Sequence, residues 1–112
     1  MEQPGSALTG IVSELLVLRV LSEREMYGYE LAKSVLALTR SEIRLREGLL
    51  YPLLHDLEQR GLLRSRKEMV AGRSRIYYRA TARGNRRRQR LTEQWQRARQ
   101  AVSAVLEGTG RV

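Results

Sequence analysis

The chain has 112 residues, no cysteine and a formal net charge of +9 at pH 7. This length allows one compact domain with little spare core, so a long additional element would need a partner surface outside that domain. The lack of cysteine excludes disulfides, zinc–thiolate sites and a thiol nucleophile, and it indicates a reducing, cytoplasmic setting. Polar residues interrupt the apolar run at residues 11–21, so we expect neither a signal peptide nor a transmembrane helix.

The positive charge is concentrated in one third of the chain. Residues 60–90 hold twelve basic residues and one acid, for a local charge of +11, whereas the other residues hold nine basic and eleven acidic ones, for −2. Because clustered like charges repel one another, a polyanion is the expected partner, either nucleic acid or an acidic membrane surface. The arginines alternate with strand-like segments rather than lining an amphipathic helix, so we favour nucleic acid and expect no membrane contact.

Two helices are predicted in the first third of the chain. Residues 8–21 are apolar on more than one side, which indicates a helix buried against its own domain and against a second surface, such as another subunit. A second helix opens at Tyr27 to Tyr29 and ends near Thr39, with Leu31 and Val35 on its inward face. Ser41 to Leu45 alternate between polar and apolar residues and fit either a short strand or an extended connection.

A third helix is predicted to begin at Gly48 and to end at Gly61, which is the expected C-cap. Its leucines lie within about 100° of arc and form an inward face. The opposite face has Gly48, Tyr51, Pro52, His55 and Gln59. Pro52 is placed in the first turn, where its missing amide has no intrahelical partner to lose.

A hairpin and a long helix complete the predicted elements. Strand-like runs over 62–70 and 75–81 flank a turn, Ala71 to Ser74, with glycine at its tip. Thr81 is the expected N-cap of a helix from Ala82 to about Glu107, in which apolar residues recur at spacings of four and three, the a/d pattern of a coiled-coil seam. These apolar residues are Leu91, Trp95, Ala98, Val102 and Val105.

Three helices followed by a basic hairpin are the order of a winged helix-turn-helix, in which the third helix enters the major groove of DNA. Tyr51, His55 and Gln59 can hydrogen-bond to phosphates or base edges, and Arg73 and Arg75 can straddle a phosphate or reach into a minor groove. The predicted fold class is mainly α with a small β-hairpin (α+β). We expect residues 1–80 to form the winged helix-turn-helix domain and 81–112 a C-terminal dimerisation helix.

Short motifs stand in a characteristic order along the chain. They are Gly28-Tyr29-Glu30, Gly48 to Pro52, Leu57-Glu58, Gly61-Leu62, Gly72 to Arg75, Tyr77-Tyr78 and Thr81 to Gly84. In this order they resemble the PadR family of bacterial transcriptional regulators, specifically its short subfamily with a single C-terminal helix. The resemblance implies a bacterial, nucleoid-associated, homodimeric repressor that pairs its C-terminal helix with the first helix of the other subunit.

The motifs and the resemblance together predict a set of residues that contact double-stranded DNA. The set is Tyr29, Lys33, Arg46, Tyr51, Pro52, His55, Gln59, Arg73 and Arg75. Arg46 replaces the serine or threonine that is usual in the family, so we expect it to grip a phosphate rather than cap the helix. Tyr51 can also brace its helix, His55 can simply be exposed, and Arg86 to Arg88 can be a solvated face. A lone histidine is a poor metal site, and no cofactor is expected.

Trp95 has two interpretations. It can be a large packing residue of the seam, or it can line a flat cavity at the dimer centre, because short members of the family stack planar hydrophobic effectors on an aromatic at this place. The second interpretation predicts a small aromatic effector, which Arg99 would favour as an anion or hydrogen-bond acceptor. Its ligand-binding residues would be Leu15, Leu18, Trp95, Ala98, Arg99 and Val102.

Two functions are consistent with these patterns. The first is a sequence-specific repressor, a homodimer that sets two third helices on successive major grooves and is released by the effector. The second is a protein that compacts nucleic acid without sequence preference, driven by the basic segment. An enzyme is not expected, because one histidine, one aspartate, no cysteine and no phosphate-cradling glycine loop leave no nucleophile and base pair.

Overall fold

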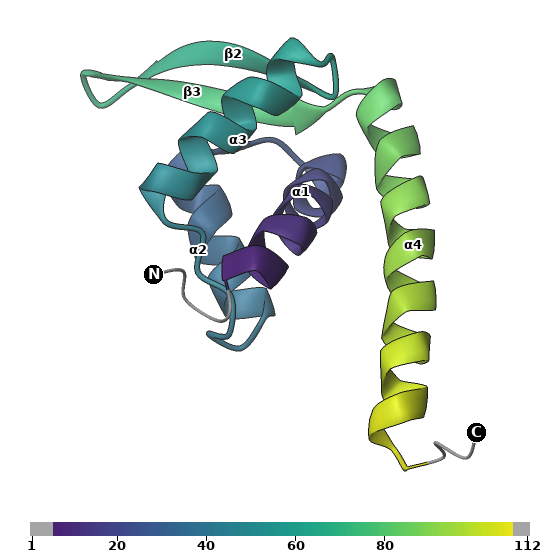
Figure 1. The fold of residues 1–112 in the computed structure, drawn as a ribbon. Helices are drawn as coiled ribbons and strands as arrows, with labels where there is room; N and C mark the ends of the chain where they lie inside the picture. Colours follow the sequence, from purple (N-terminus) through teal and green to yellow (C-terminus); the bar gives the residue numbers. More distant parts are fainter. Residues whose placement is uncertain (1–5, 109–112) are drawn as a thin grey trace.

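The computed structural model describes residues 6–108, with side chains from residue 12 onward. The elements follow in the order α1 (Ser6–Glu23), β1 (Met26–Tyr27), α2 (Gly28–Leu38), α3 (Glu47–Gln59), β2 (Leu63–Val70), β3 (Arg73–Ala80) and α4 (Ala82–Leu106), as Figure 1 shows. The predicted fold, a mainly α winged helix-turn-helix with a long C-terminal helix, is confirmed.

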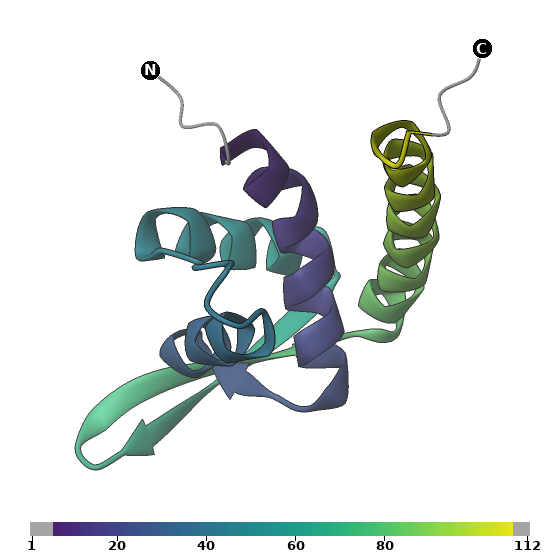
Figure 2. The same ribbon diagram turned by 90° about the horizontal axis from the view of Figure 1, so that it is seen from below.

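The hydrophobic core lies between α1, α2, α3 and one face of the sheet. Its largest fully buried side chains are leucines of the three helices: Leu18, Leu21, Leu31, Leu50, Leu54 and Leu57. Figure 2 shows α1 between the α2–α3 pair and α4. The apolar residues on more than one side of α1 are therefore explained in part by α4 of the same chain, which packs along its outer side.

The sheet has three antiparallel strands in the order β1-β3-β2. In the hairpin Val70 lies opposite Arg73, so the turn is only Ala71 and Gly72, with φ of 51° and 77°, and two positive φ angles are what a type I′ turn requires. The predicted four-residue turn was therefore wrong, and Arg73 already belongs to β3. No sequence pattern predicts β1, because two residues are too few to show an alternation.

Two further details of α3 differ from expectation. The helix begins at Glu47 with Arg46 as its N-cap, which makes Pro52 a residue of the second turn. The proline therefore removes a hydrogen bond that the Gly48 carbonyl would otherwise accept. Gly61 has a φ of 75° just beyond the helix, as predicted for the end of α3. Residues 41–45 form no strand: Ser41 and Glu42 belong to a turn in which Ser41 has a φ of 67°, and residues 43–45 connect this turn to α3.

The start of α4 is fixed against the start of the wing, the hairpin of β2 and β3. Thr81 is the N-cap as predicted: its hydroxyl accepts a hydrogen bond from the Gly84 amide at 3.0 Å and donates one to the Gly61 carbonyl at 2.7 Å. A Cβ on Gly84 would lie 2.1 Å from the Leu62 carbonyl oxygen, which is backbone and cannot move aside cheaply. Position 84 therefore requires a glycine, because the first turn of α4 passes against the backbone of Leu62, directly before β2.

One carboxylate ties α1 to both α3 and α4. Glu14 accepts hydrogen bonds from Arg60 Nη1 at 3.1 Å and from Arg87 Nε at 2.7 Å, and its side chain is 17% exposed. Burial raises the pKa of the Glu14 carboxyl, but the hydrogen bonds from Arg60 and then Arg87 outweigh burial and hold the pKa below its ordinary value. The carboxylate is therefore ionised wherever the protein is folded near neutral pH.

We expect Glu14→Gln to lower the free energy of unfolding at neutral pH by about 1–2 kcal/mol, after allowance for solvent around the partly exposed arginines. Because the folded-state pKa is lowered, the ionised carboxylate stabilises the fold above the ordinary carboxyl pKa of 4.5, and this contribution is lost as pH falls through the lower folded value. The difference between wild type and variant should therefore disappear in acid.

Urea unfolding followed by circular dichroism over a series of pH values measures this difference. Glu42→Gln is the matched control, because Glu42 is exposed and its side chain has no partner in the part of the chain that is described. A constant difference between the Glu14 variant and wild type down to strongly acid pH would contradict the assignment.

Candidate nucleic-acid interface

The outward face of α3 is exposed along its whole length. Gly48, Tyr51, Pro52, His55 and Gln59 are all exposed, while Leu50, Leu54 and Leu57 on the other side are buried. The structure therefore brings four of the predicted DNA-contacting residues together on one helix face. Their groups are a phenol, a pyrrolidine ring, an imidazole and an amide, which can meet base edges without a charge of their own.

Tyr51 is partly exposed and also braces α3 against the start of α2. Its side chain is 44% exposed, yet a Cβ added to Gly28 would lie 2.7 Å from its hydroxyl oxygen and 2.8 Å from Cε1. The ring thus lies directly on the backbone of the first residue of α2. Gly28 leaves the space for this contact, which holds the Tyr51 ring in a defined position while its outer edge faces solvent.

The helix α3 has no lysine or arginine. Glu47, Asp56 and Glu58 give residues 47–59 a formal charge of −3 with no lysine or arginine. Two of these carboxylates have internal partners: Asp56 pairs with Arg60 at 2.9 Å, and Glu58 accepts a hydrogen bond from the Ser65 hydroxyl at 2.5 Å. The attraction to phosphate must therefore come from residues that flank α3, because the helix itself repels a polyanion.

Aromatic rings link the start of α2 to the sheet. The ring centroids of Tyr27 and Tyr29 are 6.5 Å apart and stacked, and those of Tyr27 and Tyr77 are 5.6 Å apart in an edge-to-face arrangement. Lys33 Nζ lies 5.9 Å from the centroid of the Tyr29 ring, which is 65% exposed. The predicted contact residues Tyr29 and Lys33 are thus neighbours on the exposed side of α2.

Two arginines of the wing continue this ring system. The Arg75 guanidinium lies 4.4 Å from the Tyr27 ring centroid, and that of Arg66 lies 4.7 Å from the Tyr77 centroid. Arg66 Nε also donates to both carboxylate oxygens of Glu25, at 3.1 and 2.9 Å. Arg75 therefore has an internal partner, which its place near a hairpin tip did not suggest. The Arg66–Tyr77 contact lies within the wing, whereas the Arg75–Tyr27 contact joins the wing to β1, directly before α2.

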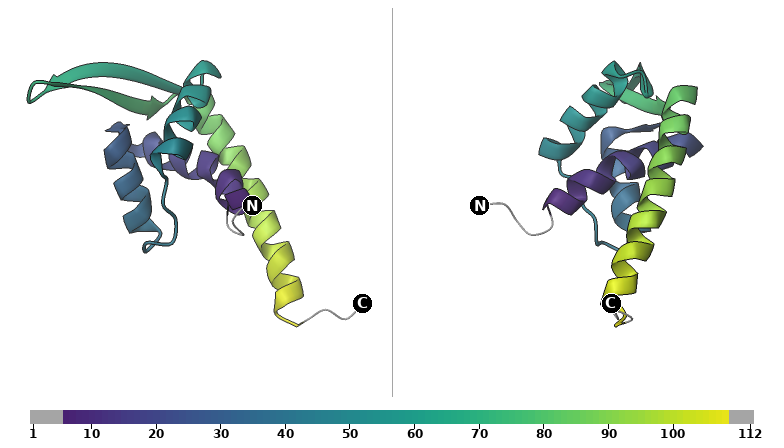
Figure 3. Two further views of the ribbon diagram at one scale, coloured as in Figure 1. Left: turned by 60° about the vertical axis from the view of Figure 1, so that its left-hand side comes forward. Right: turned by 45° about the vertical axis from the view of Figure 1, so that its right-hand side comes forward.

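The wing projects well beyond the helices, as Figure 3 shows. Arg73 is the first residue of β3, next to the turn, and it is exposed with no partner in the described part of the chain. Arg46 is exposed at the N-terminal end of α3 and makes no capping hydrogen bond with its side chain. Exposed cations therefore stand on the wing and at the start of α3, and cations of this kind pair with phosphates in protein–DNA complexes.

The residues predicted to bind an effector are only partly brought together. Leu15, Trp95 and Ala98 line a partly open cavity of about 240 Å³ between α1 and α4, together with Val12, Leu91 and Gln94. Leu18 lies instead in the core and is fully buried. Arg99 donates to the Gln96 side chain at 2.8 Å, and Val102 is 57% exposed on α4 beyond this cavity.

Among residues 6–108 no cluster of histidine, aspartate or glutamate side chains could hold a metal ion. None of the helices within that range is long and apolar enough to cross a membrane.

The fold and the exposed face of α3 define a winged helix-turn-helix protein. Residues 17–90 match the Transcriptional regulator PadR-like family. The chain belongs to this family of transcriptional regulators, which bind DNA. Transcriptional regulator Rv3488 from Mycobacterium tuberculosis is 38% identical over 94 residues, which cover 84% of this chain and 82% of that protein.

Solved structures agree in fold and class. A transcriptional regulator from Clostridium thermocellum has a TM-score of 0.82 and 26% identity, and the match covers 88% of this chain and 96% of that one. A PadR family transcriptional regulator from Eggerthella lenta has a TM-score of 0.78 and 35% identity, covering 91% of this chain and 88% of that one.

The division between a neutral α3 face and flanking cations has a measurable consequence. Lys33→Gln should weaken binding to all duplexes alike and reduce the slope of log affinity against log salt by about 0.9, because one phosphate contact is lost. His55→Ala should leave the slope unchanged and alter the preference among sequences. Fluorescence anisotropy with labelled duplexes in a salt series measures both effects.

Arg97→Gln is the matched control for charge, since Arg97 is exposed on α4, far along the helix from the wing. An equal change of slope for the Arg97 and Lys33 variants would contradict the assigned interface.

Proposed function

We propose that the chain is a homodimeric, sequence-specific repressor that a planar hydrophobic compound releases from its operator. The observation that carries this proposal is the uncovered apolar side of α4, which continues past the body of the domain in Figure 1. Trp95, Val102, Val105 and Leu106 are 37%, 57%, 70% and 78% exposed. Exposed apolar stripes of this size on a helix are typical of protein interfaces.

A second copy of the chain is the occupant that fits this stripe. The apolar residues of α4 follow the a/d spacing, and α1 is apolar on more than one side, so α4 of one copy and α1 of the other can form a continuous helical interface. A two-fold dimer would present two α3 helices to one side of a duplex. Successive major grooves on that side are about 34 Å apart, which predicts a palindromic operator.

The cavity between α1 and α4 supports the effector part of the proposal. Its volume of about 240 Å³ is below the roughly 300–1,000 Å³ of sites for drug-sized ligands. A two-fold axis near Trp95 would join two such cavities into one site of sufficient size, with an aromatic wall on each side. A ligand that separates the two α4 helices would change the spacing of the α3 pair, and so its affinity for the operator.

Selection from random duplexes, followed by footprinting of the recovered sequence, tests the repressor. We expect a palindromic site with half-sites about one helical turn apart, from centre to centre. Recovery of duplexes without a shared sequence, with a steep salt dependence, would favour non-specific compaction of DNA instead.

Trp95 is the single tryptophan, so quenching of its fluorescence reports on one place. We expect planar aromatic compounds to quench it and to weaken operator binding in the same concentration range. A Trp95→Leu variant should still dimerise and bind the operator, but it should no longer respond to the compound in anisotropy measurements. If no planar compound in a panel changed either the Trp95 fluorescence or the operator binding, the role of Trp95 would be packing alone.

A further inference from the structure

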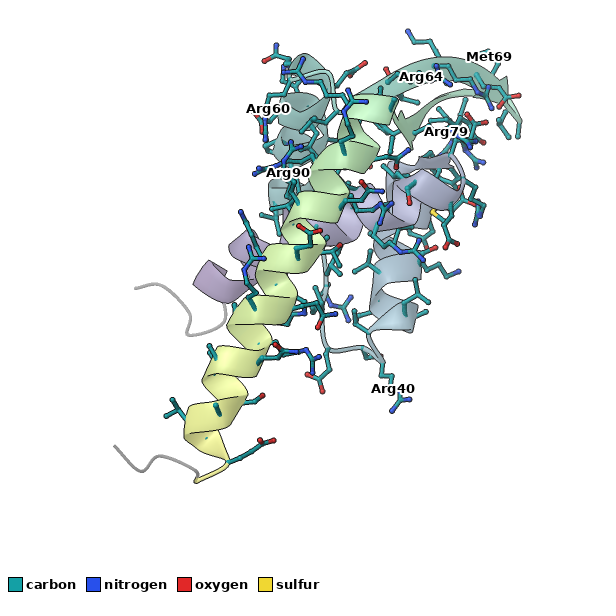
Figure 4. The ribbon with its side chains drawn as sticks, turned by 90° about the vertical axis from the view of Figure 1, so that its right-hand side faces the viewer. Arg40, Arg60, Arg64, Met69, Arg79 and Arg90 are labelled. Carbon is teal, nitrogen blue, oxygen red and sulfur yellow. The ribbon has the colours of Figure 1, made fainter. Side chains whose placement is uncertain are left out.

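The distal half of the wing exposes apolar side chains. Met69 is 67% exposed and Ile76 is 44% exposed. In the β2–β3 register Met69 lies opposite Ser74, and Lys67 lies opposite Ile76. Because side chains alternate along a strand, these four residues share one face of the hairpin. Figure 4 shows Met69 at the far end of the wing, away from the helices.

This face continues the one that is buried nearer the body. Leu63 and Tyr78 belong to the same alternation, at 2% and 9% exposure, and they pack in the core. Neither Met69 nor Ile76 belongs to the core or to the residues packed against it, so the core does not require them. Exposed apolar residues on a strand are a liability for aggregation unless another molecule covers them.

The charges around this pair select its partner. The face that holds Met69 and Ile76 has a cation, Lys67, and no acid, because Glu68 lies on the opposite face and pairs with Arg66 at 3.1 Å. Lys67 is exposed and has no partner among residues 6–108. Arg73 is also exposed, but it lies opposite Val70 and therefore on the other face of the hairpin. A second wing would bring like charges together, whereas a duplex offers phosphates on both sides of a groove.

We propose that Met69 and Ile76 form an apolar contact with the minor groove of DNA, against the deoxyribose edges, while Lys67 on the same face of the hairpin pairs with a neighbouring phosphate. The inference rests on the DNA binding in the proposed function. It assigns to the wing an apolar contribution to DNA affinity, in addition to the electrostatic one. Apolar side chains of other minor-groove proteins also enter this groove, where they insert between base steps. The contact removes apolar surface from water without displacing counterions, so its contribution does not depend on salt.

The test uses the full chain with the double substitution Met69→Ser and Ile76→Thr, and a short fluorescein-labelled duplex of fixed sequence. We expect binding about tenfold weaker at every salt concentration, since burial of two partly exposed apolar side chains is lost. The line of log affinity against log salt should shift in parallel. Lys67→Gln should instead reduce its slope by about 0.9.

Two further variants keep the test specific. Met69→Leu with Ile76→Val retains the apolar surface and should bind like wild type. Leu38→Ser removes an apolar side chain that is 73% exposed at the end of α2, and it should also bind like wild type. Thermal melts should be unchanged for the double variant, because both side chains lie outside the core.

If the plots of log affinity against log salt coincided for wild type and the double variant, the inference would be wrong, while the proposed function would stand. The inference would also fail if the substitutions changed only the oligomeric state in gel filtration, because the pair would then contact another wing. If the wild-type chain bound no duplex, both the inference and the proposed function would be wrong. If the wild-type chain bound duplexes without sequence preference, the proposed sequence-specific repressor would be wrong, but the inference about the wing would stand.

Discussion

The Glu14 carboxylate and the glycine at position 84 together decide where α4 lies. Glu14 holds Arg60 at the end of α3 and Arg87 in the second turn of α4. Gly84 lets α4 pass against the backbone of Leu62. The long helix therefore leaves the wing in one direction and reaches α1 in one register. Any dimer built on α1 and α4 inherits this direction, and with it the distance between the two α3 helices.

The charges near α3 are unevenly distributed. The helix has a formal charge of −3, and its exposed face with Tyr51, Pro52, His55 and Gln59 has no lysine, arginine or carboxylate. The cations stand on α2, at the N-cap of α3 and on the wing, where phosphates would run. In the proposed complex, the salt-dependent part of the affinity would come from these cations, and contacts to base edges would come from α3. The apolar pair on the wing would add a contribution that does not depend on salt.

Several parts of the fold and the candidate site could be predicted because they depend on local periodicity. The leucine face of α3, the Thr81 cap and the basic hairpin follow from spacing and residue type alone. The contacts of Tyr27 with Tyr77 and Arg75 could not be predicted, since they join segments about fifty residues apart through a strand of two residues. Leu18 illustrates the same limit, because a two-sided apolar helix does not reveal which side meets the core.

The sequence by itself determined the class of fold, the location of the positive charge and the faces of the helices, because amphipathic periodicity and turn chemistry are local properties. Only the tertiary structure decided which side chains remain available. It buried Leu18, occupied Arg75 with the Tyr27 ring, placed Pro52 in the second turn of α3 and left Met69 uncovered. These outcomes depend on which segments pack against each other, and exposure and pairing are properties of that packing rather than of any residue.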